Sequence, residues 1–175
     1  MKQIAFCLAI ALILLGTVTA QATEMVVTVD GKQVRMDRVT INHEITENDK
    51  NKGSQSSAMA CSFLVYGLLA KGDIQGAAKL SVDPAKAAEN WTKYRTRVGD
   101  EFFNKMMSDY FTSRNVAMAE LVLGEDIMLV VKTEDGPIAQ FYQKKAGKYL
   151  MTNDPAAGKT LGAVLSMIRE NKIKL

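Results

Sequence analysis

The chain is poor in cysteine and histidine, and this scarcity excludes several kinds of site. Its 175 residues include two cysteines, Cys7 and Cys61, and one histidine, His43. Cys7 lies in an N-terminal apolar run that we expect to be removed, so no disulfide can form within the mature chain. One cysteine and one histidine fall short of the three or four ligands of a usual zinc site. We therefore expect no metal and no other cofactor.

Sequence signatures of catalysis and of phosphate binding are missing as well. The chain has no Gly-x-Ser-x-Gly motif, no cysteine and histidine close together, and no glycine loop with phosphate-binding spacing. His43 stands beside Glu44 in the variable region before the first expected helix, which is typical of an exposed surface histidine. These absences favour a protein that is not an enzyme.

Neither sign of charge dominates. The chain has 22 basic and 19 acidic residues, a balance that gives no reason to expect a nucleic-acid partner. Residues 144–175 are more basic, with seven Lys and Arg against Asp154 and Glu170. We interpret this segment as a solvated face with cations near the end of a helix. Attraction to an anionic envelope surface or partner is the alternative.

Residues 1–22 have the features of a cleavable export signal. Lys2 is followed by an uncharged apolar run over residues 4–15, and Ala20 and Ala22 place small residues at a cleavage site after Ala22. Cleavage after Ala20 is an alternative. A membrane anchor is less favoured, because residues 4–18 are shorter than the roughly 20 apolar residues that span a bilayer. We expect a periplasmic or secreted protein of residues 23–175 with no stable membrane anchor.

The first part of the mature chain predicts a β-hairpin followed by helices. Asp30-Gly31 separates the apolar segments 25–29 and 32–36, and this dipeptide favours the type I′ turn of a hairpin. Residues 47–57 are polar and predict a loop. Apolar residues at helical spacing then predict four helices, over residues 58–70, 74–80, 84–98 and 100–113. Cys61 lies among apolar neighbours in the first helix, which indicates a buried and unreactive thiol.

Near Asn115 the hydrophobic period changes from that of a helix to that of a strand. Short connectors rich in turn-forming residues predict an antiparallel meander of strands over 116–123, 127–133, 138–144 and 148–151. The first of these strands is apolar on both sides, which indicates a central strand. Alternation predicts that one of its faces is shared by Ala117, Ala119, Leu121 and Leu123.

Helices followed by a meander indicate the α+β class. We expect an N-terminal β-hairpin, three to four helices packed on a curved four-stranded antiparallel sheet, and a C-terminal helix over residues 156–171. Residues 23–175 are expected to form a single α+β domain, with no internal repeat or linker.

The segment from Phe63 to Ser81, Phe-Leu-Val-Tyr-Gly-Leu-Leu-Ala-Lys-Gly-Asp-Ile-Gln-Gly-Ala-Ala-Lys-Leu-Ser, resembles the opening of nuclear-transport-factor-2-like cone domains. Small exported bacterial members of that superfamily are included in this resemblance. It covers about residues 58–151, the cone-like core, and it leaves out the hairpin and the last helix. The resemblance implies a cone whose sheet and helices enclose a pocket. Such domains serve both as small-molecule enzymes and as binding modules, so the fold does not decide the function.

A pocket in such a cone would be lined by helix aromatics and by strand residues that interrupt the apolar alternation. The ligand-binding candidates are Tyr66, Trp91, Tyr94, Tyr110, Glu120, Lys132, Gln140 and Tyr142. The alternative is that the aromatic residues are core and the polar ones face water. Met106, Met107 and Met118 are flexible apolar residues that suit adaptable binding, although filling the core is their more ordinary use.

Three functions stay open at the level of the sequence. The favoured one is an exported, non-catalytic binding or interaction protein that holds a small hydrophobic ligand in the cone pocket. Its partner would be a small molecule or an envelope protein. An enzyme of the hydratase or isomerase type would use Glu120 as its base with a tyrosine as hydrogen-bond donor. An obligate homo-oligomer, such as a homodimer, would pair an exposed sheet face with its copy.

Overall fold

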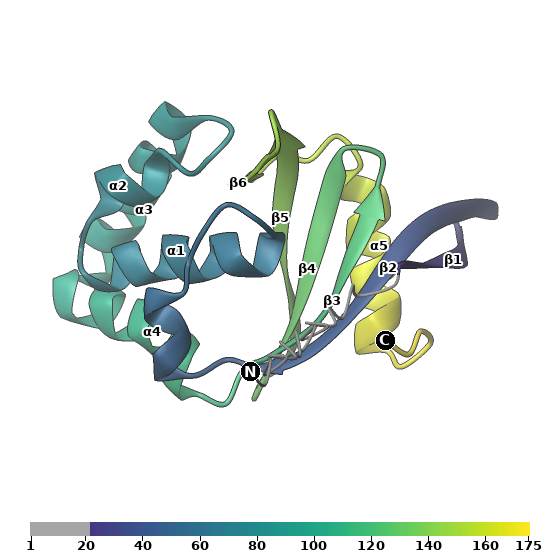
Figure 1. The fold of residues 1–175 in the computed structure, drawn as a ribbon, viewed down its shortest axis with the longest axis horizontal. Coiled ribbons are helices and arrows are strands. Elements are labelled where there is room, and N and C mark those ends of the chain that lie inside the picture. Colours follow the sequence, from purple (N-terminus) through teal and green to yellow (C-terminus); the bar gives the residue numbers. More distant parts are fainter. Residues whose placement is uncertain (1–21) are drawn as a thin grey trace, which may run out of the picture.

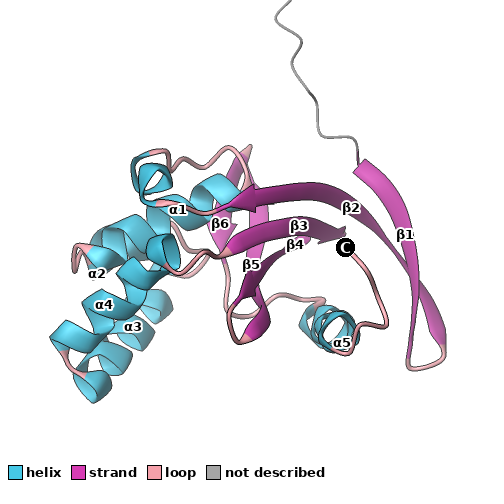
Figure 2. Ribbon diagram, turned by 90° about the horizontal axis from the view of Figure 1, so that it is seen from below, coloured by secondary structure: helices cyan, strands magenta, loops and turns pink. Residues whose placement is uncertain are grey.

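The chain has an α+β fold, built on one six-stranded antiparallel sheet. A computed structural model describes residues 22–175. The strands lie in chain order: β1 (Ala22–Val29), β2 (Lys32–Glu44), β3 (Val116–Leu123), β4 (Asp126–Thr133), β5 (Gly136–Lys145) and β6 (Lys148–Met151). The helices are α1 (Ala58–Ala70), α2 (Ile74–Ala78), α3 (Pro84–Val98), α4 (Asp100–Thr112) and α5 (Gly158–Arg169). Figures 1 and 2 show α1–α4 gathered on one side of the sheet and α5 alone on the other.

The N-terminal hairpin is confirmed, and so is the chemistry of its turn. Val29 pairs with Lys32 across the two-residue turn. Asp30 and Gly31 have φ angles of 50° and 74°, both in the left-handed region that a type I′ turn requires. A short polar residue and a glycine adopt that region at little cost, which is why this dipeptide closes the hairpin.

The sheet has six strands, and the expectation of four is therefore wrong. Strand β2 runs on to Glu44 and pairs with β3, from Asp37 opposite Val122 to Glu44 opposite Val116. This pairing adds the hairpin to the edge of the meander. The two strands are separated in the chain by all four helices of one layer, so no local sequence signal announces their contact.

Two irregularities in the sheet change which side chains share a face. The register shifts by one residue between Thr40 and His43 of β2, and again between Ala117 and Ala119 of β3. A bulge adds one residue to a strand and so moves the residues beyond it to the other face. Ala117 consequently packs on the side of α1–α4, whereas Ala119 and Leu121 pack on the side of α5. The predicted single face is wrong, but burial on both sides is confirmed.

Each face of the sheet has its own hydrophobic cluster. The helix-side cluster lies between the sheet and α1–α4 and includes Phe63, Phe103, Phe111, Leu129 and Tyr142. The α5-side cluster lies on the other face and includes Val27, Met36, Leu121, Val130 and Leu161. Residues of β3 and β4 contribute to both clusters, because these two strands are central and covered on both faces.

The helices begin largely where their capping residues predict. Ser57, Asp73 and Asp83 each accept a hydrogen bond from a backbone N–H three residues later, at the start of α1, α2 and α3. The last helix differs from the prediction, since it begins at Gly158 and ends at Arg169 rather than spanning 156–171. Its first residues form a turn instead, in which the Gly158 N–H donates to the Pro155 carbonyl.

The segment predicted as a loop contains a 3₁₀ helix over Glu47–Asn51, organised by a buried carboxylate. Asp49 is 1% exposed and accepts hydrogen bonds from Thr46, Lys52 and His43, whose Nε2 lies 3.0 Å from Asp49 Oδ2. Burial alone would raise the pKa of Asp49, but these hydrogen bonds outweigh it and lower the pKa to about 2. The expectation of an exposed, isolated His43 is wrong, because this side chain is half-buried against Asp49 and Phe63.

Candidate functional site

Helix α1 brings two polar side chains into the helix-side cluster. Ser62 and Tyr66 are four residues apart and therefore lie on the same side of the helix. Tyr66 stacks on Tyr110 of α4, with the ring centroids 4.1 Å apart and the planes within 14° of parallel. The stacked pair joins α1 to α4 on the helical side of the sheet.

The hydrogen bonds of the Ser62 hydroxyl determine whether the Tyr110 hydroxyl donates or accepts. Ser62 Oγ donates to the Met59 carbonyl at 2.7 Å and lies 2.9 Å from Tyr110 Oη. A serine hydroxyl has one proton, so Tyr110 must be the donor in the second bond. The oxygen of Tyr110 therefore keeps its capacity to accept a hydrogen bond.

Strand β5 adds a third tyrosine and an amide to this cluster. Gln140 and Tyr142 are two residues apart on the strand and face the helices together. The hydroxyl of Tyr142 donates to Gln140 Oε1 at 2.9 Å. Gln140 is 6% exposed, and its Nε2 has no hydrogen-bond partner among the described residues. A buried polar group left unpaired costs about 1–3 kcal/mol, so this amide requires an explanation.

The tyrosine hydroxyls of this cluster are donors and acceptors rather than bases. Burial raises the pKa of Tyr66, Tyr110 and Tyr142, and Tyr142 is fully buried. All three hydroxyls consequently stay protonated at neutral pH.

A groove of about 430 Å³ opens beside the stacked tyrosines, between α4 and the turn from β4 to β5. Tyr66 and Tyr110 line it together with Met106, Met107 and Ile138, and the polar rim is formed by Asp109, Ser113, Asn115, Thr133, Glu134 and Asp135. Its lining is mainly apolar, and its volume falls within the range of small-molecule sites. We refer to this feature as the tyrosine groove.

Two of the eight sequence candidates, Tyr66 and Tyr110, line the groove, and two more, Gln140 and Tyr142, are buried and hydrogen-bonded to each other without lining it. Trp91 and Tyr94 lie on α3 and pack against the helix-side cluster instead. The Tyr94 hydroxyl lies 3.3 Å from Met106 Sδ, so Tyr94 touches a residue of the groove without lining it. Lys132 is exposed and lies on the α5 side of the sheet, where it does not join the others.

Glu120 has a structural use at the start of α1. Its carboxylate accepts a hydrogen bond from the Met59 N–H at 3.2 Å, and the side chain is 7% exposed. Burial raises the pKa of Glu120, and hydrogen bonds from the N–H groups of Met59 and Ala58 act against that rise. A carboxylate at this position satisfies orphan donors of the first turn and interacts favourably with the helix dipole.

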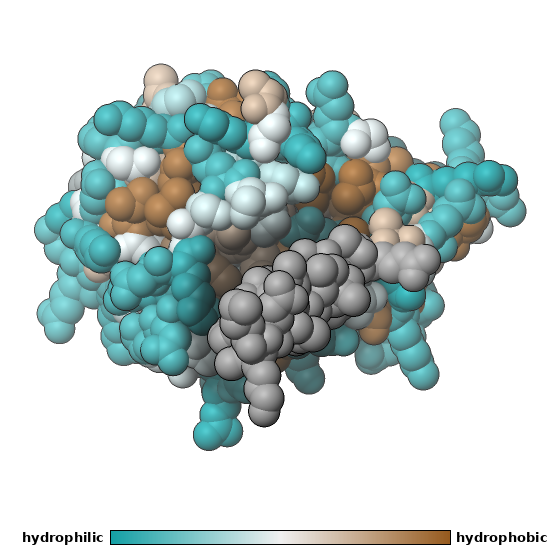
Figure 3. Space-filling model, in the orientation of Figure 1, coloured by the Kyte–Doolittle hydropathy of each residue, from teal (hydrophilic) through white to brown (hydrophobic). Residues whose placement is uncertain are grey.

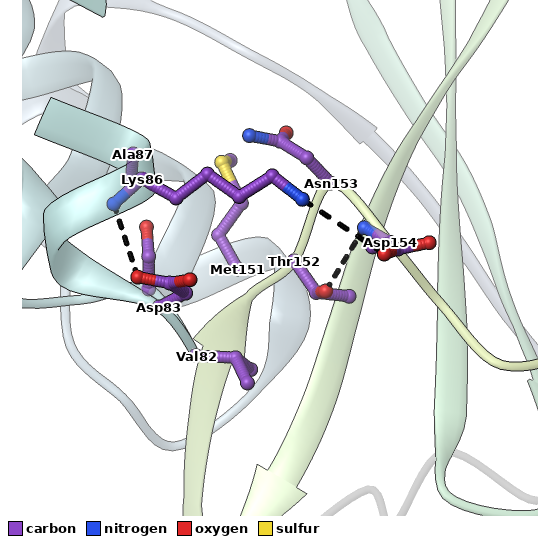
Figure 4. A pocket seen from close by; sticks show the side chains of 9 residues that line it. Val82, Asp83, Lys86, Ala87, Met151, Thr152, Asn153 and Asp154 are labelled. Carbon is purple, nitrogen blue, oxygen red and sulfur yellow. Dashed lines mark hydrogen bonds and ion pairs between the residues drawn. The ribbon is translucent and has the colours of Figure 1, made fainter. Parts of the chain in front are cut away.

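Two other hollows have different chemistry. Figure 4 shows one of about 230 Å³ between the start of α3 and the chain after β6, where Lys86 reaches Asp154 and Asp83 caps the helix. Its charged groups are therefore already engaged with one another or with the backbone. The second hollow, of about 410 Å³, lies on the α5 side and is lined by Met118, Lys132 and the C-terminal residues. We refer to it as the α5 groove.

Hydrophobic side chains are scattered over the outer surface. On the face shown in Figure 3, hydrophobic side chains appear in separate small areas among hydrophilic ones. Among the described residues, Val26 and Phe102 are the exposed large hydrophobic side chains, at 47% and 56%. Scattered apolar residues of this kind are ordinary on a protein surface.

Some residues of the cluster and the groove were not selected as candidates from the sequence. Ser62 could have been suspected, since it is a polar residue in the middle of an apolar helix. Ile138 and Asn115 carry no such signal, because their place in the groove depends on how α4 approaches β5. Asn115 is 5% exposed and donates to the Tyr110 carbonyl at 3.0 Å, which ends α4 beside the groove.

Neither a metal site nor a membrane-spanning helix is present in residues 22–175. No group of three or more Cys, His, Asp or Glu side chains there is arranged to hold a metal ion. None of the helices in that range combines the length and the apolar character needed to cross a bilayer.

Comparisons of the chain with protein-family models, with curated proteins and with solved structures give no match.

Replacing Glu120 tests whether this carboxylate is structural. Glu120→Gln keeps an acceptor for the Met59 N–H, so its free energy of unfolding should stay within about 1 kcal/mol of the wild type. Glu120→Ala leaves that donor unpaired and should lose about 2 kcal/mol. Urea unfolding of both variants between pH 4 and pH 8 measures the difference.

The contribution of Glu120 to stability should change with pH in a defined direction. The folded state holds the Glu120 proton more tightly than the unfolded chain does, so this group's contribution to stability falls as pH rises through the raised pKa. Glu120→Gln removes this dependence. If Glu120→Gln instead destabilised the protein as much as Glu120→Ala, the negative charge itself would be required.

Proposed function

We propose that the protein is an exported, non-catalytic binding protein whose ligand occupies the tyrosine groove. The ligand is a small, mainly apolar molecule that carries one hydrogen-bond acceptor, such as a carbonyl group. The observation that carries this proposal is the buried Nε2 of Gln140, which has no hydrogen-bond partner among the described residues and lies on the same face of β5 as Ile138 of the groove lining.

The groove lining suits a mainly apolar ligand. Met106 and Met107 are unbranched and polarizable, so they adapt to ligands of different shape. Tyr66 and Tyr110 provide aromatic faces for stacking. Acidic residues on the rim, among them Glu134 and Asp135, favour a neutral or cationic ligand over an anionic one.

The free donor of Gln140 calls for a hydrogen-bond acceptor on the ligand. Gln140 lies two residues from Ile138 on the same face of β5, and Ile138 lines the groove together with Tyr66 and Tyr110. A ligand that moves the edge of the Tyr66 or Tyr110 ring aside can place its acceptor within reach of Gln140 Nε2. The new hydrogen bond then offsets the cost of burying that N–H group. Binding then gains both from apolar contact and from a hydrogen bond that only the complex makes.

A binding role is favoured over catalysis because the titratable groups of the cluster are tyrosines and the nearby Glu120 already has a structural partner. The tyrosines keep their protons, and the carboxylate of Glu120 is occupied by the first turn of α1. The resemblance of residues 63–81 to cone domains also supports a pocket in this part of the chain. Export is supported by the features of residues 1–22, which apart from Ala22 lie outside the described residues.

Matched methionine variants locate the binding site. The neutral naphthyl ketone 6-propionyl-2-(dimethylamino)naphthalene should bind the wild type with a blue-shifted emission. Met106→Gln makes the tyrosine groove more polar at nearly constant size and should weaken binding about tenfold. Met118→Gln makes the same change in the α5 groove and should leave the affinity unchanged. Equal weakening by both variants, or no binding by the wild type, would contradict the proposal.

A double replacement tests the hydrogen bond from Gln140. Gln140→Leu combined with Tyr142→Phe removes both partners of a buried pair, so stability should be retained or rise. The ketone probe should lose about fivefold or more in affinity, since one hydrogen bond contributes about 1 kcal/mol. N-phenyl-1-naphthylamine has no carbonyl group and should bind as before. Similar losses for both probes would mean that the amide does not bind the ligand.

Export is tested by the location and the N-terminal residue of the protein recovered from bacteria. Expression of the whole chain should give a periplasmic or secreted product that begins at Thr23, which N-terminal sequencing identifies. A cytoplasmic product that retains Lys2 would contradict export.

A further inference from the structure

The free edge of β1 is a second surface with a defined chemistry. Within residues 22–175, β1 pairs with β2 on one side and with no strand on the other. The hairpin projects away from the helical layer in Figures 1 and 2, so its outer edge is not covered by α1–α4. An edge of this kind presents a row of backbone N–H and C=O groups that can pair with another strand.

Strand β1 lacks the usual features that keep edge strands apart. Over residues 22–29 there is no proline or lysine, and the pairing with β2 is regular with no bulge. Glu24 is its one charged residue. The exposed Val26 stands at the middle of the strand, at 47% exposure. The strand is therefore regularly paired, carries one charge and is apolar at its centre, which favours pairing.

The turn determines which residues of β1 point their backbone groups outward. In a hairpin with a two-residue turn, the residues that flank the turn form a hydrogen-bonded pair, here Val29 and Lys32. Hydrogen-bonded and non-hydrogen-bonded pairs alternate along the ladder. The N–H and C=O groups of Thr28, Val26 and Glu24 consequently point away from β2, toward the free edge.

We propose that β1 pairs with β1 of a second copy of the chain, antiparallel and centred on Val26. Opposed residues in an antiparallel pair lie on the same face, so the two-fold axis must pass through a residue. Centring on Val26 places Val26 opposite its copy and Glu24 opposite Thr28 of the second chain. Glu24, Val26 and Thr28 are the residues whose backbone N–H and C=O groups point toward the free edge. Each opposed pair therefore exchanges hydrogen bonds between the two chains.

Other registers are less favourable for physical reasons. Centring on Glu24 opposes two carboxylates, and centring on Val27 places Glu24 opposite Asp30 of the second chain. Centring on Met25 places Glu24 opposite Val26. Like charges directly opposed across strands destabilise the pair, and a charge opposite a valine gains nothing.

The Val26 register also extends the apolar layer beneath the sheet. Met25 and Val27 belong to the α5-side cluster, and in this register each lies opposite the other across the two-fold axis. On the other face, the two Val26 side chains contact and cover each other. The two sheets then become one continuous sheet, which removes both exposed edges.

The oligomeric state of the protein expressed from its full sequence tests this interface. Size-exclusion chromatography with light scattering at tens of micromolar should give twice the mass of one chain. Val26→Lys opposes two cations at the axis and should raise the dimer dissociation constant at least tenfold. Gln33→Lys adds the same charge at an exposed position of β2, away from the edge, and should leave the dimer intact. A monomeric wild type would overturn the proposal.

Cysteine variants test the register itself. Val26→Cys places two thiols in one opposed pair with Cα atoms about 5.5 Å apart, within the range of a disulfide. Mild oxidation should therefore cross-link this variant into a dimer. Thr28→Cys places its two thiols on the order of 13 Å apart along the strands and should not cross-link. It also controls for Cys61, which is fully buried. Equal cross-linking of both variants would overturn the Val26 register.

Discussion

Helix α1 is held against the sheet by hydrogen bonds that the strands supply, and the helical layer depends on this contact. The helix is apolar around most of its circumference, so hydrophobic burial alone would not determine its rotation about its own axis. Polar contacts do so instead. The carboxylate of Glu120 on β3 accepts from the Met59 N–H, and the Cys61 thiol donates to the Tyr149 carbonyl at 3.2 Å. Burial raises the pKa of that thiol to about 12, so it stays protonated and serves as a donor.

The orientation of α1 explains why a polar cluster exists inside an apolar layer. With the first turn of α1 fixed at Glu120, Ser62 and Tyr66 face α4 and β5 rather than solvent. Ser62 then accepts from Tyr110, and the Tyr66 ring stacks on the Tyr110 ring. Buried networks of this kind rigidify a site when all members are satisfied, and an unsatisfied member is costly. The Nε2 of Gln140 is that member, and Gln140 lies on the same face of β5 as Ile138, which lines the groove.

The two proposed interaction surfaces lie at different parts of the sheet. The tyrosine groove is beside β5 and α4, at the end covered by helices, whereas the free edge belongs to β1. Strands β2, β3 and β4 lie between β1 and β5 in the sheet. Helix α5 contacts both β1 and β5. A ligand in the groove and a second chain at the edge therefore do not compete for the same residues. The bulges in β2 and β3 lie between these regions.

Local signals in the sequence were sufficient for the class and for most elements. The Asp30-Gly31 turn, the capping residues of α1–α3 and the change of period near Asn115 all correspond to elements of the structure. Tyr66, Tyr110, Gln140 and Tyr142 could be selected as candidates, because polar or amphipathic residues in apolar segments stand out. These are properties of neighbouring residues, and turn conformation, capping and periodicity act within a few residues.

Only the tertiary structure decided which of these elements meet. The pairing of β2 with β3, the buried position of Asp49 beside His43, and the separation of Lys132 from the other candidates all join or divide residues far apart in the chain. A single added residue in β3 moved Ala117 to the opposite face from Ala119, and no local preference encodes that shift. The sequence by itself determined the elements and their polar residues, because those depend on short-range conformational energies. Packing between distant segments determined the groove, because its walls come from α1, α4 and β5, which no local interaction brings together.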